Sequence, residues 1–286
     1  IPLMSPMTRN RTISNGCYWR LWRGERKLFR KILLMQAFIK KEFIVSKRYL
    51  VNSLGGVITL YVIFLLMFGG YQGLRSLAGV GGGTMEGLVA GYVLWLFMLT
   101  TYQDAWYTLR TEAQQGTLEQ LYMSVHSFGW VMGAKVVAGF FFNLLLVAVL
   151  LGAALLTTGV TLNIDLLSLG PVLIGTLLGS WAIGFAIGGI TLVLKRIDSY
   201  TQMVQFLLIA LVAAPAGRVL WMRLLPCSFG SALISRIMVD GMNLTQIGMG
   251  DLLLVYGIGL VHLGLGCGIY KLCERKAMLQ GTLGHY

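Results

Sequence analysis

The chain has 286 residues, of which 56% are hydrophobic and only 12% are charged. Soluble domains usually carry about 25% charged residues, so this chain has too little charge to cover a water-facing surface. The composition excludes a soluble enzyme and a disordered chain, and it indicates an integral membrane protein. The net charge of +12 does not indicate nucleic-acid binding, because twelve of the 23 basic residues precede position 50 and no interleaved basic and aromatic face is present.

Six apolar segments are candidates for membrane-spanning helices, which need about 20 mostly apolar residues each. They cover approximately residues 51–70, 87–106, 130–157, 169–194, 201–217 and 252–272. The fifth segment is short and is broken by Pro215. Residues 218–251 are too apolar for a free loop and too short for two spans, so we expect short helices that re-enter the membrane from outside. The predicted fold class is therefore all-α integral membrane, with six transmembrane helices.

The basic residues predict the orientation, because Lys and Arg collect on the cytoplasmic side of membrane proteins. If the N-terminus is cytoplasmic, six spans return the C-terminus to the cytoplasm. The basic residues that then lie outside are Arg75, Arg218, Arg223 and Arg236. We therefore expect a cytoplasmic polar tail over residues 1–27, a membrane domain over 28–276 and a cytoplasmic tail over 277–286.

Residues 28–50 have the pattern of an amphipathic helix that lies in the membrane interface. At 100° per residue, Arg30, Lys41 and Arg48 line one face. Ile32, Ile39, Phe43 and Leu50 line the opposite face. The basic residues expected to meet anionic headgroups are Arg30, Lys40, Lys41, Lys47 and Arg48. A solvated cytoplasmic helix that docks a partner is the alternative.

The sequence contains no recognisable catalytic or metal-binding constellation. It lacks a Walker A motif, so the chain cannot hydrolyse ATP through a phosphate loop. The four cysteines have no metal-ligand spacing and are expected to fill apolar space. His262 lies inside the sixth span, where we favour a neutral ring bonded to a neighbouring helix over a functional group. Asp104 lies near the cytoplasmic end of the second span, where we expect water to reach it. We predict no catalytic residue, no metal and no cofactor in this chain.

Paired small residues predict close helix packing, because they let two backbones approach. The pairs are Gly175 and Gly179, and Gly184 and Gly188, on opposite faces of the fourth span, and Gly264 and Gly268 on the sixth. We therefore expect the fourth span to be packed between neighbours.

The cytoplasmic segment 111–124 contains the most informative pattern. Leu118, Leu121 and Tyr122 form an apolar edge at helical spacing, and Gly116 interrupts the helix. Thr117 is able to cap a second short helix. A short helix pair that projects from two spans would transmit force from a soluble partner, although an ordinary solvated loop also fits the pattern.

This segment resembles the E…GTLEQL…SP signature of ABC type-2 transporter permeases, which follows the second of six spans in that family. The matching residues are Glu112, Gly116, Thr117, Leu118, Glu119, Gln120, Leu121 and Ser124, with Val125 in place of the usual proline. The resemblance extends from about Lys40 to Lys276. It includes the stretch from Leu225 to Gly241, which is similar to the family's LP…Y…R…G stretch.

The resemblance implies the permease subunit of an ATP-driven exporter in the cell inner (plasma) membrane. Two copies, or two related chains, would form the pathway, and each would bind a separate ABC ATPase that carries ATP and Mg²⁺. Glu112 and residues 116–121 would fit a groove on that ATPase. The first, second and fifth spans would line the pathway, with Tyr92, Trp95, Tyr102 and Trp106 as candidate lining residues. A belt or packing role for these aromatic side chains is the alternative.

Two other classes fit the sequence less well. A secondary transporter or channel would need charged or broken sites inside the membrane. An intramembrane lipid-processing enzyme would need paired acids or clustered histidines at membrane depth. The sequence contains almost none of these features.

Overall fold

The computed structural model describes residues 31–78, 84–124, 127–194, 197–214, 216 and 219–280, and every regular element in these ranges is helical. A helix over residues 31–48 is followed by α2 (Leu50–Ala78), α3 (Met85–Gln114), α4 (Leu118–Tyr122), α5 (Phe128–Thr158), α6 (Leu166–Leu194), α7 (Asp198–Ala213), the 3₁₀ turn η1 (Leu220–Leu224), α8 (Ser228–Asp240) and α9 (Met249–Leu279). The all-α prediction is confirmed for these residues. The predictions for residues 1–27, Arg30 and 281–286 lie outside the described ranges.

Five of the described helices are long and apolar enough to cross a membrane, namely α2, α3, α5, α6 and α9. The chain is therefore a multi-pass membrane protein. The count of six spans is not confirmed, because the apolar part of α7 covers only Ser199–Ala213. Ala214 leaves the helix with an extended backbone, at φ −61° and ψ 131°. The next residue in the sequence is Pro215, which disfavours a helical conformation at the residue before it.

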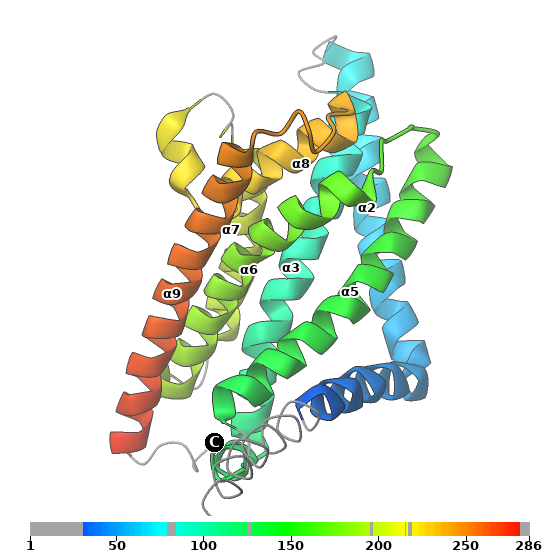
Figure 1. The fold of residues 1–286 in the computed structure, drawn as a ribbon. Helices are drawn as coiled ribbons and strands as arrows, with labels where there is room; N and C mark the ends of the chain where they lie inside the picture. The colour runs from blue at the N-terminus through cyan, green and yellow to red at the C-terminus, as the bar shows by residue number, and fades with distance from the viewer. Residues whose placement is uncertain are drawn as a thin grey trace, which may run out of the picture.

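The long helices lie side by side, with one short element across each end (Figure 1). The helix over residues 31–48, drawn in dark blue, crosses the end where α9 finishes, and we call this the basal end. α8 crosses the opposite end, which we call the distal end. α6 packs against both α3 and α9, so it occupies the centre of the bundle.

The glycines of α6 allow its neighbours to approach closely. Gly184 and Gly188 lie against α3, and a Cβ added at Gly184 would be 2.8 Å from a backbone oxygen of that helix. Gly175 lies against α9, and Gly179 lies against Cys227 at the start of α8. The prediction that the fourth span has two closely packed faces is therefore confirmed.

The predicted glycine pair of α9 is wrong. A Cβ at Gly264 or Gly268 would meet nothing within 4 Å in the part of the chain that the structure describes. Gly259 and Gly266 make the close contacts with α6 instead, and each approaches a backbone carbonyl oxygen. These two residues are about two helical turns apart on one face, which is the face that meets α6.

Residues 219–248 form two short helices instead of a free loop, as predicted. α8 buries Phe229, Leu233 and Ile237 in the core that it shares with α3 and α6. At the distal end, Asn163 donates its backbone N–H to the Met238 carbonyl at 2.9 Å. These contacts make α8 part of the bundle, whereas its re-entry into the membrane stays a prediction.

Candidate functional site

The turn after α3 is held by one carboxylate at the basal end. Glu112, in the last turn of α3, forms an ion pair with Lys135 of α5 and accepts a hydrogen bond from the Thr117 hydroxyl. The Thr117 backbone N–H donates to the Glu112 carbonyl at 3.1 Å. Gly116, between them, has φ +67°, in the left-handed region that favours glycine. We call residues 112–117, together with Lys135, the latch, because they join α3, the turn and α5.

A hydrophobic cluster packs around α4 beside the latch. Its buried members come from α3, α4, α5, α6 and α9 and are Leu109, Ala113, Leu118, Met132, Leu192, Tyr270 and Ala277. Tyr122 stacks on Phe128 with ring centroids 4.3 Å apart, and its hydroxyl is 3.0 Å from the Tyr270 hydroxyl. α4 therefore packs within a cluster that also contains residues of α3, α5, α6 and α9.

The opposite side of this turn is uncovered. Gln114, Gln115, Gly116 and Gln120 are exposed, and Met123 is 80% exposed. We call this set the outer face of the turn. It is polar except for Met123, and it is the part of the segment that a soluble protein could contact.

The structure divides the predicted coupling residues into two groups. Glu112, Thr117 and Leu118 hold the turn in place, and Leu121 is half-buried. Gly116 and Gln120 belong to the outer face. The side chain of Glu119 lies outside what the structure describes. The sequence did not single out Lys135, although an isolated lysine near the start of an apolar helix was a usable signal.

The helix over residues 31–48 is braced against α5. The Lys31 ammonium lies 4.6 Å from the Trp130 ring centroid, and the Phe43 and Phe142 rings meet edge to face at 6.1 Å. The Lys135 ammonium lies 5.5 Å from the Phe38 ring, so the latch also contacts this helix. The predicted headgroup-facing residues Lys40, Lys41, Lys47 and Arg48 are all exposed.

Two of the four candidate lining residues border an apolar pocket. Tyr92 and Trp95 line a volume of about 310 Å³ between α2, α3 and α7, in the distal half of the bundle. The Tyr92 hydroxyl donates to the Leu60 carbonyl at 2.6 Å, and the Trp95 ring N–H donates to the Gln205 carbonyl at 3.3 Å. Both polar atoms are therefore satisfied by backbone, which leaves the apolar parts of the rings to form the wall.

The other two aromatic residues are part of the protein core. Tyr102 is fully buried and donates its hydroxyl to the Thr201 carbonyl at 3.2 Å. Trp106 is buried beside the guanidinium of Arg110, which lies 5.5 Å from its ring. Neither residue lines the pocket that contains Tyr92 and Trp95.

A polar contact inside the bundle was missed from the sequence. Buried Asn143 of α5 donates to the Asp104 carboxylate of α3 at 2.6 Å, where we expected water instead. A Cβ at Gly139 would lie 2.6 Å from the same carboxylate oxygen, so the glycine makes room for it. The spacing of Gly139 and Asn143, one helical turn apart in an apolar span, was the available signal.

His262 bonds within its own helix instead of to a neighbour. Its Nδ1 donates to the Ile258 carbonyl at 2.8 Å, which corrects the expected interhelical bond. Within the described ranges, no group of three or more His, Cys, Asp or Glu side chains is placed to hold a metal ion.

Comparison of the chain with models of known protein families and with curated proteins finds no match. The resemblance of residues 112–124 to the permease signature therefore stays a prediction.

Proposed function

We propose that this chain is the transmembrane permease subunit of an ATP-driven exporter of the ABC type-2 kind. The latched turn carries the proposal, because it combines an exposed outer face with an ion pair to α5 and is followed by α4, which packs in a cluster with residues of α3, α5, α6 and α9. An ATPase that pushes on the outer face would move these helices together instead of bending a loop. The chain has no phosphate loop of its own, so ATP and Mg²⁺ belong to the partner.

The proposed topology has six passes, with α7 as the fifth. Tyr102 and Trp95 of α3 bond to Thr201 and Gln205 of α7, in the order expected for antiparallel neighbours. α7 would cross the inner membrane while shielded by α3 and α8. The basal end would then be cytoplasmic, together with both chain termini and most Lys and Arg residues. Residues 218–251 would re-enter the membrane from outside.

A second copy, or a related permease, would complete the pathway. Few of the described side chains in the apolar stretch of α2 are buried within this chain. The pocket lined by Tyr92 and Trp95 lies beside α2 and α7 and would face the pathway. The ATPase would drive transport by binding the inward-open and outward-open states with different affinities.

Affinity purification of the full-length chain from its own membranes tests this proposal. We expect an ABC ATPase to co-purify and the complex to hydrolyse ATP. Gln120→Arg combined with Met123→Arg should release the ATPase, because two charged side chains would occupy the outer face. Leu279→Arg is the matched control, since Leu279 is 81% exposed at the basal end of α9 and lies outside the turn.

Two outcomes would contradict the permease proposal. One is a purified chain that carries no ATPase and has no ATP hydrolysis associated with it. The other is unchanged ATPase retention in the Gln120→Arg/Met123→Arg protein.

The contact between Asp104 and Asn143 favours a second candidate, a proton-coupled secondary transporter. A carboxylate bonded inside a helical bundle is a typical proton carrier in such proteins. Asp104→Asn separates the two candidates, because it keeps the size of the side chain and removes its titration. ATP hydrolysis by a co-purified complex should survive this change in the exporter. A secondary transporter would show no associated ATPase and would lose proton-coupled uptake in the variant.

A further inference from the structure

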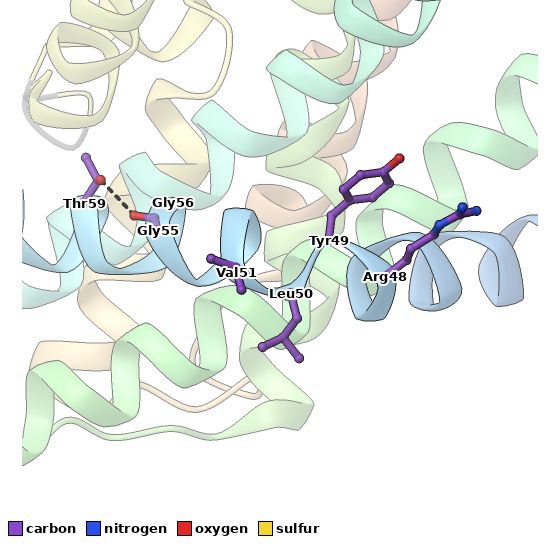
Figure 2. A pocket seen from close by; sticks show the side chains of 7 residues that line it. All are labelled: Arg48, Tyr49, Leu50, Val51, Gly55, Gly56 and Thr59. Carbon is purple, nitrogen blue, oxygen red and sulfur yellow. Dashed lines mark hydrogen bonds between the residues drawn. The ribbon is translucent and has the colours of Figure 1, made fainter.

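The elbow between the helix over residues 31–48 and α2 contains a hollow of about 660 Å³. Figure 2 shows its wall, which consists of Arg48, Tyr49, Leu50, Val51, Gly55, Gly56 and Thr59. The helical backbone continues through the elbow, since the Tyr49 N–H donates to the Val45 carbonyl and the Ser53 N–H donates to the Tyr49 carbonyl, each at 2.9 Å. We call this feature the elbow hollow.

The hollow exists because two consecutive residues have no side chain. A Cβ added at Gly55 or Gly56 would meet nothing within 4 Å among the described residues. Thr59 donates its hydroxyl to the Gly55 carbonyl at 2.8 Å, so its polar atom is already satisfied. The glycine end of the hollow is therefore apolar in character.

The wall changes from charged at Arg48 to mainly apolar along α2. Arg48 precedes the apolar stretch, which begins at Ser53, and Gly55 and Thr59 lie within that stretch. At about 1.5 Å per residue, α2 rises about 14 Å between Leu50, next to the elbow, and Thr59. This distance covers the headgroup layer and the upper acyl chain of one leaflet.

The charge at the rim is positive. Lys47, next to Arg48, is also exposed, and none of the described wall residues is acidic. Val51 at the rim is 85% exposed. An apolar group of a ligand would bury this side chain, whereas a water-soluble anion would not. An amphiphile with a negative headgroup matches both parts of the wall.

We infer that the elbow hollow binds one anionic phospholipid, with its phosphate at Arg48 and an acyl chain along Gly55 and Gly56. The bound lipid would brace the elbow and hold the helix over residues 31–48 at the membrane surface. The inference goes beyond the proposed permease function, and it does not require an ATPase partner.

Native mass spectrometry of the detergent-solubilised full-length chain tests the inference. The protein is titrated with phosphatidylglycerol and with phosphatidylcholine that has identical acyl chains. We expect tighter binding of phosphatidylglycerol, and Arg48→Gln should weaken it about fivefold, the effect of one cation near an anionic headgroup. Arg75→Gln, near the far end of α2, is the charge-matched control and should leave the affinity unchanged.

A second pair of variants tests the shape of the hollow. Gly55→Leu with Gly56→Leu places two apolar side chains at the glycine end of the hollow. A Cβ at either position meets nothing within 4 Å among the described residues, and leucine has a higher helix propensity than glycine, so loss of folding is not expected. This protein should lose the tight phosphatidylglycerol site. Gly69→Leu with Gly70→Leu is the matched control, because these glycines of α2 also face open space among the described residues.

Three results would overturn the lipid site. The first is a phosphatidylglycerol affinity that neither Arg48→Gln nor the filled hollow changes. The second is displacement of phosphatidylglycerol by millimolar inorganic phosphate, which would assign the rim to a soluble anion. The third is that Gly55→Leu with Gly56→Leu dissociates an oligomer of the chain while phosphatidylglycerol still binds. This result would assign the hollow to contact between copies of the chain.

Discussion

The ion pair of Glu112 and Lys135 is the central interaction of the latch at the scale of single residues. The two side chains are only 16% and 10% exposed, so removing either partner leaves a poorly solvated charge. We expect Glu112→Gln or Lys135→Met alone to lower the free energy of unfolding by about 3 kcal/mol. The double variant should cost less than the sum of the two single changes. Unfolding in mixed micelles measures these free energies. Lys40→Met changes an exposed residue and is the control, which should stay within about 0.5 kcal/mol of the parent. If the loss of unfolding free energy in the double variant equals the sum of the two single losses, the ion pair does not hold the latch.

Asp165 gives a pH-dependent prediction at the distal end of α6. Its carboxylate accepts hydrogen bonds from the Ser168 hydroxyl and, at 3.1 Å, from the Leu167 N–H. These bonds hold the pKa of Asp165 below its usual range. A carboxyl with a lowered folded-state pKa stabilises the fold above its unfolded-state pKa, and this stability is lost as the pH falls through the folded-state value. The parent protein should therefore lose thermal stability below about pH 4.

Asp165→Asn separates this titration from helix capping, because asparagine also caps helices well. The variant should melt below the parent at pH 7, and the difference in melting temperature should shrink as the solution becomes acidic. Thermal melting in detergent over this pH range is the measurement. Parallel melting curves for the two proteins at every pH would rule out a contribution from the Asp165 carboxylate.

At the scale of elements, packing of α9 against α6 depends on which glycines face the partner. Gly266→Ala would place a methyl group against the Ala182 carbonyl oxygen, which belongs to rigid backbone. We expect it to destabilise the protein by about 1–3 kcal/mol, as overpacking does. Gly264→Ala, half a turn away and facing open space among the described residues, should be neutral or slightly stabilising. Equal losses in both variants would place the α6–α9 contact on a different face.

The sequence predicts the long helices well because apolar length is a local property. It predicts their contacts less well, since contacts depend on how each helix is rotated. The glycine pairs predicted in α6 are confirmed because this helix is packed on two faces, and each pair therefore lies against another helix. The predicted close contact at Gly264 and Gly268 is not found because only one face of α9 meets α6. The spacing of small residues does not show which face of α9 that is.

At the scale of the whole molecule, contacts between helices that are distant in the sequence are again not predicted. Residues 112–121 were found because they are contiguous. Lys135, Tyr122 with Tyr270, and Asp104 with Asn143 come together only when distant helices pack. The exposure of Gln120 and the burial of Leu118 likewise follow from the packing of α4 against the bundle.

The number of membrane crossings decides where the latch faces. If α7 crosses with the five longer helices, Lys47 and Leu279 lie on one side of the membrane and Thr245 lies on the other. In a cysteine-free background, Thr245→Cys should react with an impermeant maleimide in intact cells. Lys47→Cys and Leu279→Cys should react only after permeabilisation, because positive charge keeps the basal end in the cytoplasm. If only five helices cross, Lys47→Cys and Leu279→Cys would differ from each other. The latch and the end of α9 would then lie on opposite sides of the membrane, although Tyr122 of α4, beside the latch, contacts Tyr270 of α9.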